Sequence, residues 1–103
     1  MTDTLIMPAD CDTMAEVRAG VDATDRALME LLDRRFGYMR AAARIKRDRE
    51  SVRDEARKAQ VISAAVADAA ARGLPAGAIG EIWDRLVEAS IAYEFVEWDR
   101  QRS

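Results

Sequence analysis

The sequence has 103 residues, of which 50% are hydrophobic and 34% charged, and its formal net charge is -3. A chain of this length forms one domain with a modest core, so an oligomer that buries more apolar surface is favoured. The acidic balance argues against a general nucleic-acid binder, which needs a basic surplus. The chain has no histidine and a single cysteine, Cys11, which excludes a zinc site, a histidine-activated nucleophile and a disulfide framework.

Residues 1–12 read as a loose lead-in to the first helix. They lack the basic segment and apolar run of a signal peptide, and no stretch of the chain approaches the roughly 20 apolar residues that cross a bilayer. We therefore expect a cytoplasmic protein. The lead-in ends at Thr13-Met14-Ala15-Glu16, a capping box in which the threonine and glutamate side chains each bond the other residue's backbone amide. A helix is predicted to start there.

Three helices are predicted in the order long, medium, long, because the chain is rich in Ala, Arg, Asp and Glu and low in β-branched residues. The first helix runs from about residue 14 to about residue 49, and the polar run 47–54 is its predicted break. The second covers about 55–72, with Asp54 as its N-cap and Gly73 as its left-handed stop. The third covers about 76–100. The fold class is all-α, and residues 1–103 form a single helical domain.

The first predicted helix is some 50 Å long at about 1.5 Å per residue. Its apolar stripe contains Val21, Leu28, Leu32, Met39 and Ala42. The two shorter helices cannot cover a stripe of that length, and a lone chain would leave its far half exposed. An intertwined homodimer solves this problem.

Three cations share this stripe, namely Arg18, Arg35 and Lys46. Arg35 and Lys46 lie eleven residues apart on one helix face, about three turns, and could bind an anion between them. The alternative is ordinary ion pairing with Asp22, Asp25 or Glu30. Arg18 lies about 42 Å from Lys46 along the helix and cannot reach the same small ligand within one chain. If all three serve one site, Arg18 must come from the partner subunit.

The third predicted helix places Ser90 and Glu94 one turn apart on an otherwise apolar face. A carboxyl group among apolar neighbours can stay protonated, so Glu94 could donate a hydrogen bond. The alternative is that Glu94 simply pairs with a cation. Arg57 and Lys58 begin the second helix, where the backbone amides favour anions, but many helices begin in charged residues.

The run MAEVRAGVDATDRALMELLDRRFGYMRAAARIKRDRESVRDEARKAQVI, residues 14–62, resembles the all-helical chorismate mutase family. The resemblance rests on the Arg-x-x-Val-Asp-x-x-Asp opening, the Arg-Arg pair in mid-helix, the lysine at the helix end and the Val-Arg-Asp turn, and it extends over about residues 8–98. It implies a domain-swapped dimer of three-helix chains with two active sites. Each site takes one arginine from the partner, as the distance argument requires.

The same resemblance implies roles for the candidate site residues. Arg18 of the partner chain and Arg35 of the same chain would clamp the two carboxylates of the substrate, and Lys46 would donate to its ether oxygen. Glu94 would face that oxygen from the other side. The remaining implied contacts are Asp54 and Lys58 at the substrate hydroxyl, Arg57 as a supporting cation and Ser90 at a carboxylate.

The implied reaction is the rearrangement of chorismate to prephenate, a step in aromatic amino acid biosynthesis from the shikimate pathway. It needs no nucleophile, metal or cofactor, because the protein only selects a compact conformer and stabilises charge on the ether oxygen. Ser90, Glu94 and the Val-Arg-Asp turn favour a mutase.

Two alternatives from the same family remain open, an isochorismate-pyruvate lyase and a mutase of amino-substituted chorismate. Lys58 stands where well-known mutases carry a glutamate, and the lyases also lack that glutamate. Pro8-x-x-Cys11 is similar to the lyase branch. A third alternative, from another class, is a non-catalytic helical dimer that acts as an interaction module.

Overall fold

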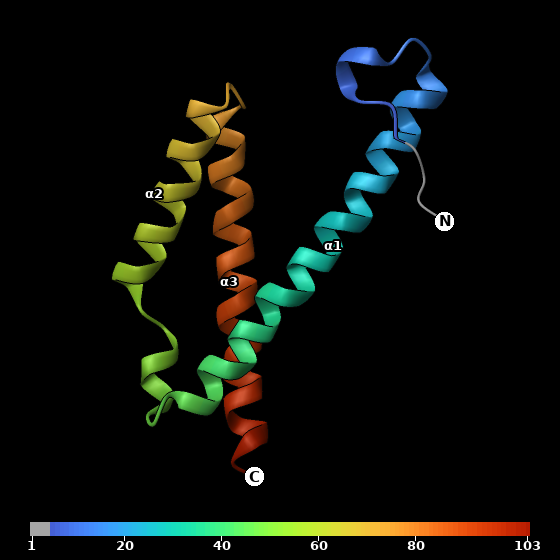
Figure 1. The fold of residues 1–103 in the computed structure, drawn as a ribbon. Coiled ribbons are helices and arrows are strands. Elements are labelled where there is room, and N and C mark those ends of the chain that lie inside the picture. Colours follow the sequence, from blue (N-terminus) through green and yellow to red (C-terminus); the bar gives the residue numbers. More distant parts are fainter. Residues whose placement is uncertain (1–4) are drawn as a thin grey trace. The chain divides into compact units, whose positions relative to one another are not determined.

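The computed structural model describes residues 5–103, and within them every regular element is helical. The elements are the short 3-10 helix η1 Pro8–Asp10, the long helix α1 Met14–Ile45, the 3-10 helix η2 Arg49–Val52, and the helices α2 Glu55–Ala71 and α3 Ala76–Gln101 (Figure 1). This confirms the all-α class and the order long, medium, long. The homodimer and the single domain stay predictions.

The chain divides into two compact units, residues 1–35 and residues 36–103. In the first unit the predicted capping box is present. The backbone amide of Glu16 donates to Thr13 Oγ1 at 3.2 Å, and the amide of Thr13 donates to Glu16 Oε1 at 3.0 Å. Hydrogen bonds from the backbone amides of Asp12 and Thr13 lower the pKa of Glu16. These bonds fix the start of α1 at Met14, as predicted.

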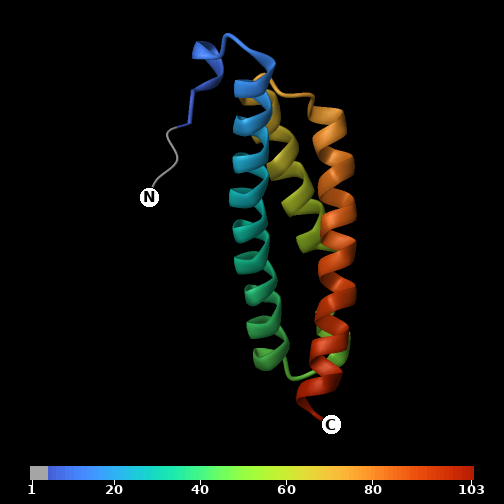
Figure 2. The same cartoon turned by 90° about the vertical axis from the view of Figure 1, so that its right-hand side faces the viewer.

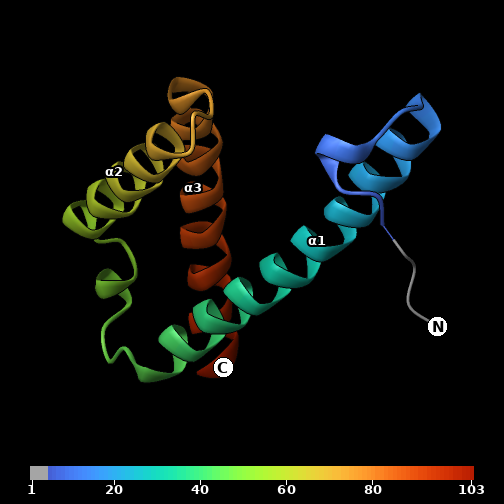
Figure 3. The same cartoon turned by 45° about the horizontal axis from the view of Figure 1, so that its top comes forward.

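The described part of the lead-in folds back beside the first turns of α1 (Figure 3). A pocket of about 560 Å³ opens between them, and its lining is Leu5, Ile6, Met7, Pro8, Cys11, Val17, Gly20, Val21, Thr24 and Asp25. No lysine or arginine lines this pocket, so it does not fit a dianion.

Helix α1 ends at Ile45 instead of about residue 49. The amide of Lys46 still donates to the carbonyl of Ala42, at 2.9 Å, but Asp48 is extended, with φ -114 and ψ 136. The carbonyl of Lys46 accepts from Trp98 on α3 and from Arg102 directly after it, and these bonds take the place of further helical bonds. The predicted end was therefore wrong because tertiary contacts stop the helix early.

In the second unit α2 and α3 form an antiparallel hairpin (Figure 2). Asp54 caps α2 by accepting from the amide of Arg57 at 3.0 Å, and Gly73 ends the helix region with a φ of 72, both as predicted. At Gly80 an added Cβ would lie 3.0 Å from Val66 Cγ2, so glycine permits the close approach of the two helices.

The core of the second unit gathers around Val52, Val87 and Ile91. Val61, Ile62, Phe95 and Trp98 pack against these residues. The last turns of α1 contact α3 through an edge-to-face pair of rings, Phe36 and Tyr93, with ring centroids 5.0 Å apart. Arg40 also donates to the hydroxyl of Tyr93 at 2.8 Å, and Lys46 lies beside Glu94 in the C-terminal half of α3.

The first unit leaves much of its apolar stripe exposed in the single chain. Val21 is 51% exposed and Leu28 is 50% exposed. Exposed apolar residues on the same stretch of α1 also include Met14, Val17, Met29 and Leu31. A surface of this kind normally marks a contact with another protein.

Candidate active site

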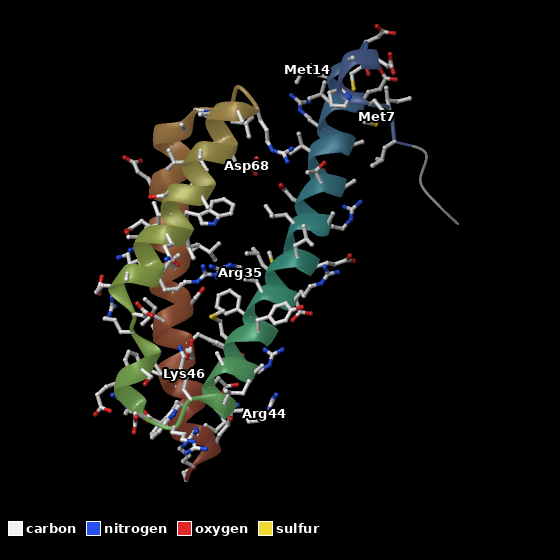
Figure 4. All side chains as sticks on the ribbon, turned by 60° about the vertical axis from the view of Figure 1, so that its left-hand side comes forward. Met7, Met14, Arg35, Arg44, Lys46 and Asp68 are labelled. Atoms are coloured by element: carbon white, nitrogen blue, oxygen red, sulfur yellow. The ribbon has the colours of Figure 1, made fainter. Side chains whose placement is uncertain are left out.

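The candidate site is built around an ion pair between Lys46 and Glu94. Lys46 Nζ lies 2.8 Å from Glu94 Oε2, and Figure 4 labels Lys46 where α1 ends. Glu94 is only 4% exposed, whereas the side chain of Lys46 is 30% exposed. A buried carboxylate and a partly accessible ammonium therefore meet at the predicted position.

The ion pair leaves Lys46 able to bind a ligand. An ammonium group has three N–H donors, and Glu94 accepts one of them. Glu94 has the cationic partner that the simpler alternative predicted. A protonated Glu94 stays a prediction for the complex with substrate.

Ser90 lies one turn before Glu94 on the same face of α3 and is 3% exposed. Its hydroxyl donates to the carbonyl of Leu86 at 2.7 Å. A hydroxyl also has acceptor lone pairs and can rotate its proton toward a different acceptor. Ser90, Glu94 and Lys46 thus form the part of the predicted site that the second unit brings together.

Lys58 belongs to a separate cluster of charges between α2 and α3. Its ammonium lies 2.7 Å from Glu88 Oε2 and 3.2 Å from Asp84 Oδ1. Arg53 binds Glu88 through both terminal nitrogens, at 2.8 and 3.1 Å. Glu88 precedes Ser90 by two residues, about 200° around the helix, so it faces away from Ser90. The role of Lys58 at a substrate hydroxyl stays a prediction.

This cluster predicts an acid-sensitive contribution to stability. Hydrogen bonds from Arg53 and Lys58 lower the pKa of Glu88 from 4.5 to about 2. A lowered pKa stabilises the fold above the unfolded value, and the contribution disappears as the pH falls from about 4.5 toward 2. We expect Glu88→Gln to lower the melting temperature at pH 7 by a few degrees and to leave it unchanged near pH 2. Equal melting shifts at both pH values would contradict this.

Asp54 and Arg57 lie at the start of α2, as predicted, but the side chain of Asp54 accepts from the amide of Arg57 as a helix cap. Arg57 lines a hollow of about 330 Å³ between α2 and α3, together with Trp83 and Asp68. Neither side chain has a described contact with Lys46 or Glu94. Their substrate roles stay predictions.

Arg18 and Arg35 lie on α1 within the first unit. Arg18 is exposed, whereas Arg35 is partly buried and interacts with other groups. Figure 4 labels Arg35 on α1, eleven residues before Lys46. Their predicted contacts with the carboxylates of a substrate remain to be tested.

Two features near the site were not predicted from the sequence. Glu97 is 6% exposed, one turn beyond Tyr93, whose hydroxyl lies 3.5 Å from Glu97 Oε1 and accepts from Arg40 at 2.8 Å. The stripe that contains Ser90 and Glu94 continues through Glu97, and this spacing could have identified it. The second feature is the pair of donors on the Lys46 carbonyl, for which the sequence carries no signal.

Among residues 5–103, no cluster of three or more Asp, Glu, Cys or His side chains could hold a metal ion. Within the same residues, no helix is both long and apolar enough to cross a membrane.

Comparison with known families decides the classification. A model of the family "Chorismate mutase type II" matches residues 17–95, which is more than half of the chain. The chain belongs to this family. The match spans the three helices and contains Arg18, Arg35, Lys46 and Glu94. Membership in the chorismate mutase type II family supports an enzyme that acts on a chorismate-type substrate and argues against a purely structural interaction module.

The chain is also similar in sequence to the isochorismate pyruvate lyase of Pseudomonas aeruginosa. The two sequences are 26% identical over 95 residues, which is 92% of this chain and 94% of the lyase. The chain therefore resembles the lyase over nearly its full length, at an identity too low to carry over its reaction.

Proposed function

We propose that the protein is a chorismate mutase that converts chorismate to prephenate. The observation that carries the proposal is the pair Lys46 and Glu94, 2.8 Å apart at the buried face of α3, in a chain of the chorismate mutase type II family. This reaction redistributes bonds within one molecule, so a site made of positioned donors is sufficient.

In the proposed mechanism the ether C–O bond of chorismate breaks while a C–C bond forms between the ends of the rearranging fragment, and no atom or proton leaves. Negative charge grows on the ether oxygen as its bond lengthens. Lys46 donates to this oxygen from one side, and Glu94, protonated in the complex, donates from the other. Both hydrogen bonds to the ether oxygen are stronger in the transition state than in the ground state, which is the condition for catalysis.

The carboxylates of the substrate are bound in this proposal by Arg35 of the same chain, by Arg18 of a partner chain and by Ser90. Arginine suits this role because its planar group binds a carboxylate through two parallel hydrogen bonds. A homodimer supplies the second arginine. The exposed apolar stripe on α1, with Val21 and Leu28 half exposed in the single chain, supports such a dimer.

Asp54 and Lys58 complete the proposed site at the ring hydroxyl, with Arg57 as a supporting cation. Lys58 binds both Glu88 and Asp84, so at most one of its three N–H donors is left for a ligand. Recognition of the hydroxyl is therefore proposed to be weaker than in enzymes that use a glutamate there.

Binding of a bicyclic dicarboxylate that mimics the compact transition state tests the proposal. Calorimetry on the wild type is expected to give one saturable site per chain, and Lys46→Ala should weaken binding strongly. A protein that acts only as an interaction module would show no saturable binding at all.

Glu94 predicts a pH dependence of turnover. An ether oxygen only accepts hydrogen bonds, so Glu94 must hold a proton when substrate is bound. The active acid form is lost as the pH rises, so kcat should fall toward alkaline pH, while Glu94→Gln should flatten the profile because an amide donates at every pH. Glu97→Gln is the matched control, since Glu97 is a buried glutamate on the same helix face, and it should keep the wild-type profile. A wild-type kcat that does not change with pH would contradict a protonated Glu94 as donor to the ether oxygen.

An isochorismate-pyruvate lyase is the second candidate, because the lyase from Pseudomonas aeruginosa matches 92% of this chain. That reaction would use the same clamps and the same Lys46, with release of pyruvate instead of rearrangement. A mutase of amino-substituted chorismate is a third variant of the same site. The identity of the small product distinguishes these reactions.

A further inference from the structure

The backbone carbonyl of Lys46 accepts two hydrogen bonds from α3 and its end. Trp98 Nε1 donates to it at 3.1 Å, and Arg102 Nη2 donates at 2.7 Å. The last carbonyls of any helix lack partners within that helix, and most are satisfied by water or by a local turn. Here two side chains from a residue range more than 50 positions away satisfy one carbonyl, that of the lysine in the candidate active site.

The two donors are themselves held together. The guanidinium carbon of Arg102 lies 4.1 Å from the centroid of the Trp98 ring, a cation–π contact, and Arg102 Nη1 donates to the Trp98 carbonyl at 3.2 Å. A neighbouring bond from Gln101 Nε2 to the carbonyl of Arg40, at 3.2 Å, ties the same end of α3 to α1. Trp98 also packs against the core around Val52 and Ile91. The two donors therefore contact each other as well as the carbonyl of Lys46.

The spacing along α3 relates these donors to Glu94. Glu94, Trp98 and Arg102 follow one another at intervals of four residues, so they lie in a column along one side of the helix. Glu94 binds the ammonium of Lys46, while Trp98 and Arg102 bind its carbonyl. The amide of Lys46 is fixed as well, by its bond to Ala42 at 2.9 Å. Side chains of this column therefore bind both the ammonium and the backbone carbonyl of Lys46.

We propose that Trp98 and Arg102 are positioning residues that fix the backbone of Lys46, so that its ammonium faces Glu94 at the distance the reaction needs. This proposal rests on the mutase function proposed above. A lysine side chain has four rotatable bonds and reaches its target only as accurately as its backbone is placed. A misplacement of about 1 Å in a positioned group can cost roughly 100-fold in rate. Loss of the clamp that Trp98 and Arg102 form on the Lys46 carbonyl should therefore change kcat more than KM.

The test compares Trp98→Phe, Arg102→Ala and Arg102→Lys in the full chain, with kcat and KM measured on chorismate. Trp98→Phe removes the donor and keeps an aromatic ring, while Arg102 is exposed and can be changed without a cavity. We expect Trp98→Phe and Arg102→Ala each to lower kcat by about 10-fold to 100-fold, with KM within about threefold. Arg102→Lys keeps a donor and should recover part of the loss.

Arg44→Ala is the matched control. Arg44 is an exposed arginine two residues before Lys46, about 200° around α1, and Figure 4 labels both residues. Its removal should leave kcat unchanged. If the variants lower only the melting temperature and keep the wild-type kcat, or if Arg44→Ala slows turnover as much as Arg102→Ala, the positioning role is overturned.

A second readout does not depend on activity. Hydrogen exchange of the indole N–H of Trp98, assigned against Trp83 with the Trp98→Phe variant, reports the bond to the Lys46 carbonyl. We expect slow exchange in the wild type and faster exchange in Arg102→Ala. A wild type without mutase activity but with a protected indole would refute the proposed function and keep the clamp, whereas fast exchange in the wild type would refute the clamp itself.

Discussion

Replacing Lys46 with alanine is expected to lower kcat/KM for chorismate by about a thousandfold, because it removes the main donor to the ether oxygen as charge develops there. The loss should appear mostly in kcat and at every pH, since alanine has no group that can donate to the ether oxygen. Glu94 would lose the cation that lies 2.8 Å from its carboxylate, so the site would also lose its local charge balance. Steady-state kinetics at three pH values measure this effect.

Two further variants separate charge from folding. Lys46→Arg keeps a cation and should retain more activity than Lys46→Ala. Its melting temperature should also differ less from that of the wild type. Lys58→Ala changes the chain's other lysine, which binds Glu88 and Asp84, and we expect a much smaller effect that falls mainly on KM. A Lys46→Ala enzyme with activity within threefold of the wild type would contradict the proposed mechanism.

Mixing two inactive variants is expected to restore activity if Arg18 acts across the dimer. Arg18→Ala and Lys46→Ala homodimers should each be nearly inactive. In a mixed dimer one site combines the intact Lys46 of one chain with the intact Arg18 of the other, while the second site carries both changes. The purified mixed dimer should therefore recover about half of the wild-type kcat. Differently tagged chains, co-expressed and purified over both tags, provide this sample.

The reason for the expected recovery is distance. Arg18 lies on α1 and Lys46 directly follows its last residue, 28 positions later, and an α-helix rises about 1.5 Å per residue, so no small dianion contacts both in one chain. A matched control mixes Arg35→Ala with Lys46→Ala. In that dimer each site carries one defect, because Arg35 and Lys46 of one chain serve the same site, so activity should stay low. Recovery in the Arg35 mixture, or none in the Arg18 mixture, would contradict the assignment of Arg18 to the partner.

The helices could be predicted from sequence because their start and stop signals are local. The capping box at Thr13, the cap at Asp54 and the glycine at position 73 act within one turn, and the structure contains all three. The end of α1 could not be predicted in this way. It depends on donors from Trp98 and Arg102, and no local pattern around residue 46 records them.

Part of the candidate site could be named from local sequence patterns. Ser90 and Glu94 are candidates because polar residues interrupt an apolar face at helical spacing, and Lys46 is one because it ends the stripe of α1. The structure brings Lys46 and Glu94 into contact, and the substrate roles stay predictions. The binding of Lys58 to Glu88 and Asp84 was missed, since charged residues at a helix start have many possible partners and only the packing of α2 on α3 selects among them. Glu97 was missed although its spacing continues the same face.

The central claim is that this site rearranges chorismate, and one measurement tests it most directly. Purified protein is given chorismate and isochorismate separately, and prephenate, pyruvate and salicylate are followed for each. The proposal predicts prephenate from chorismate with little pyruvate, at a kcat/KM well above that for isochorismate. Pyruvate and salicylate from isochorismate at far higher efficiency would contradict it and assign the chain to the lyase reaction.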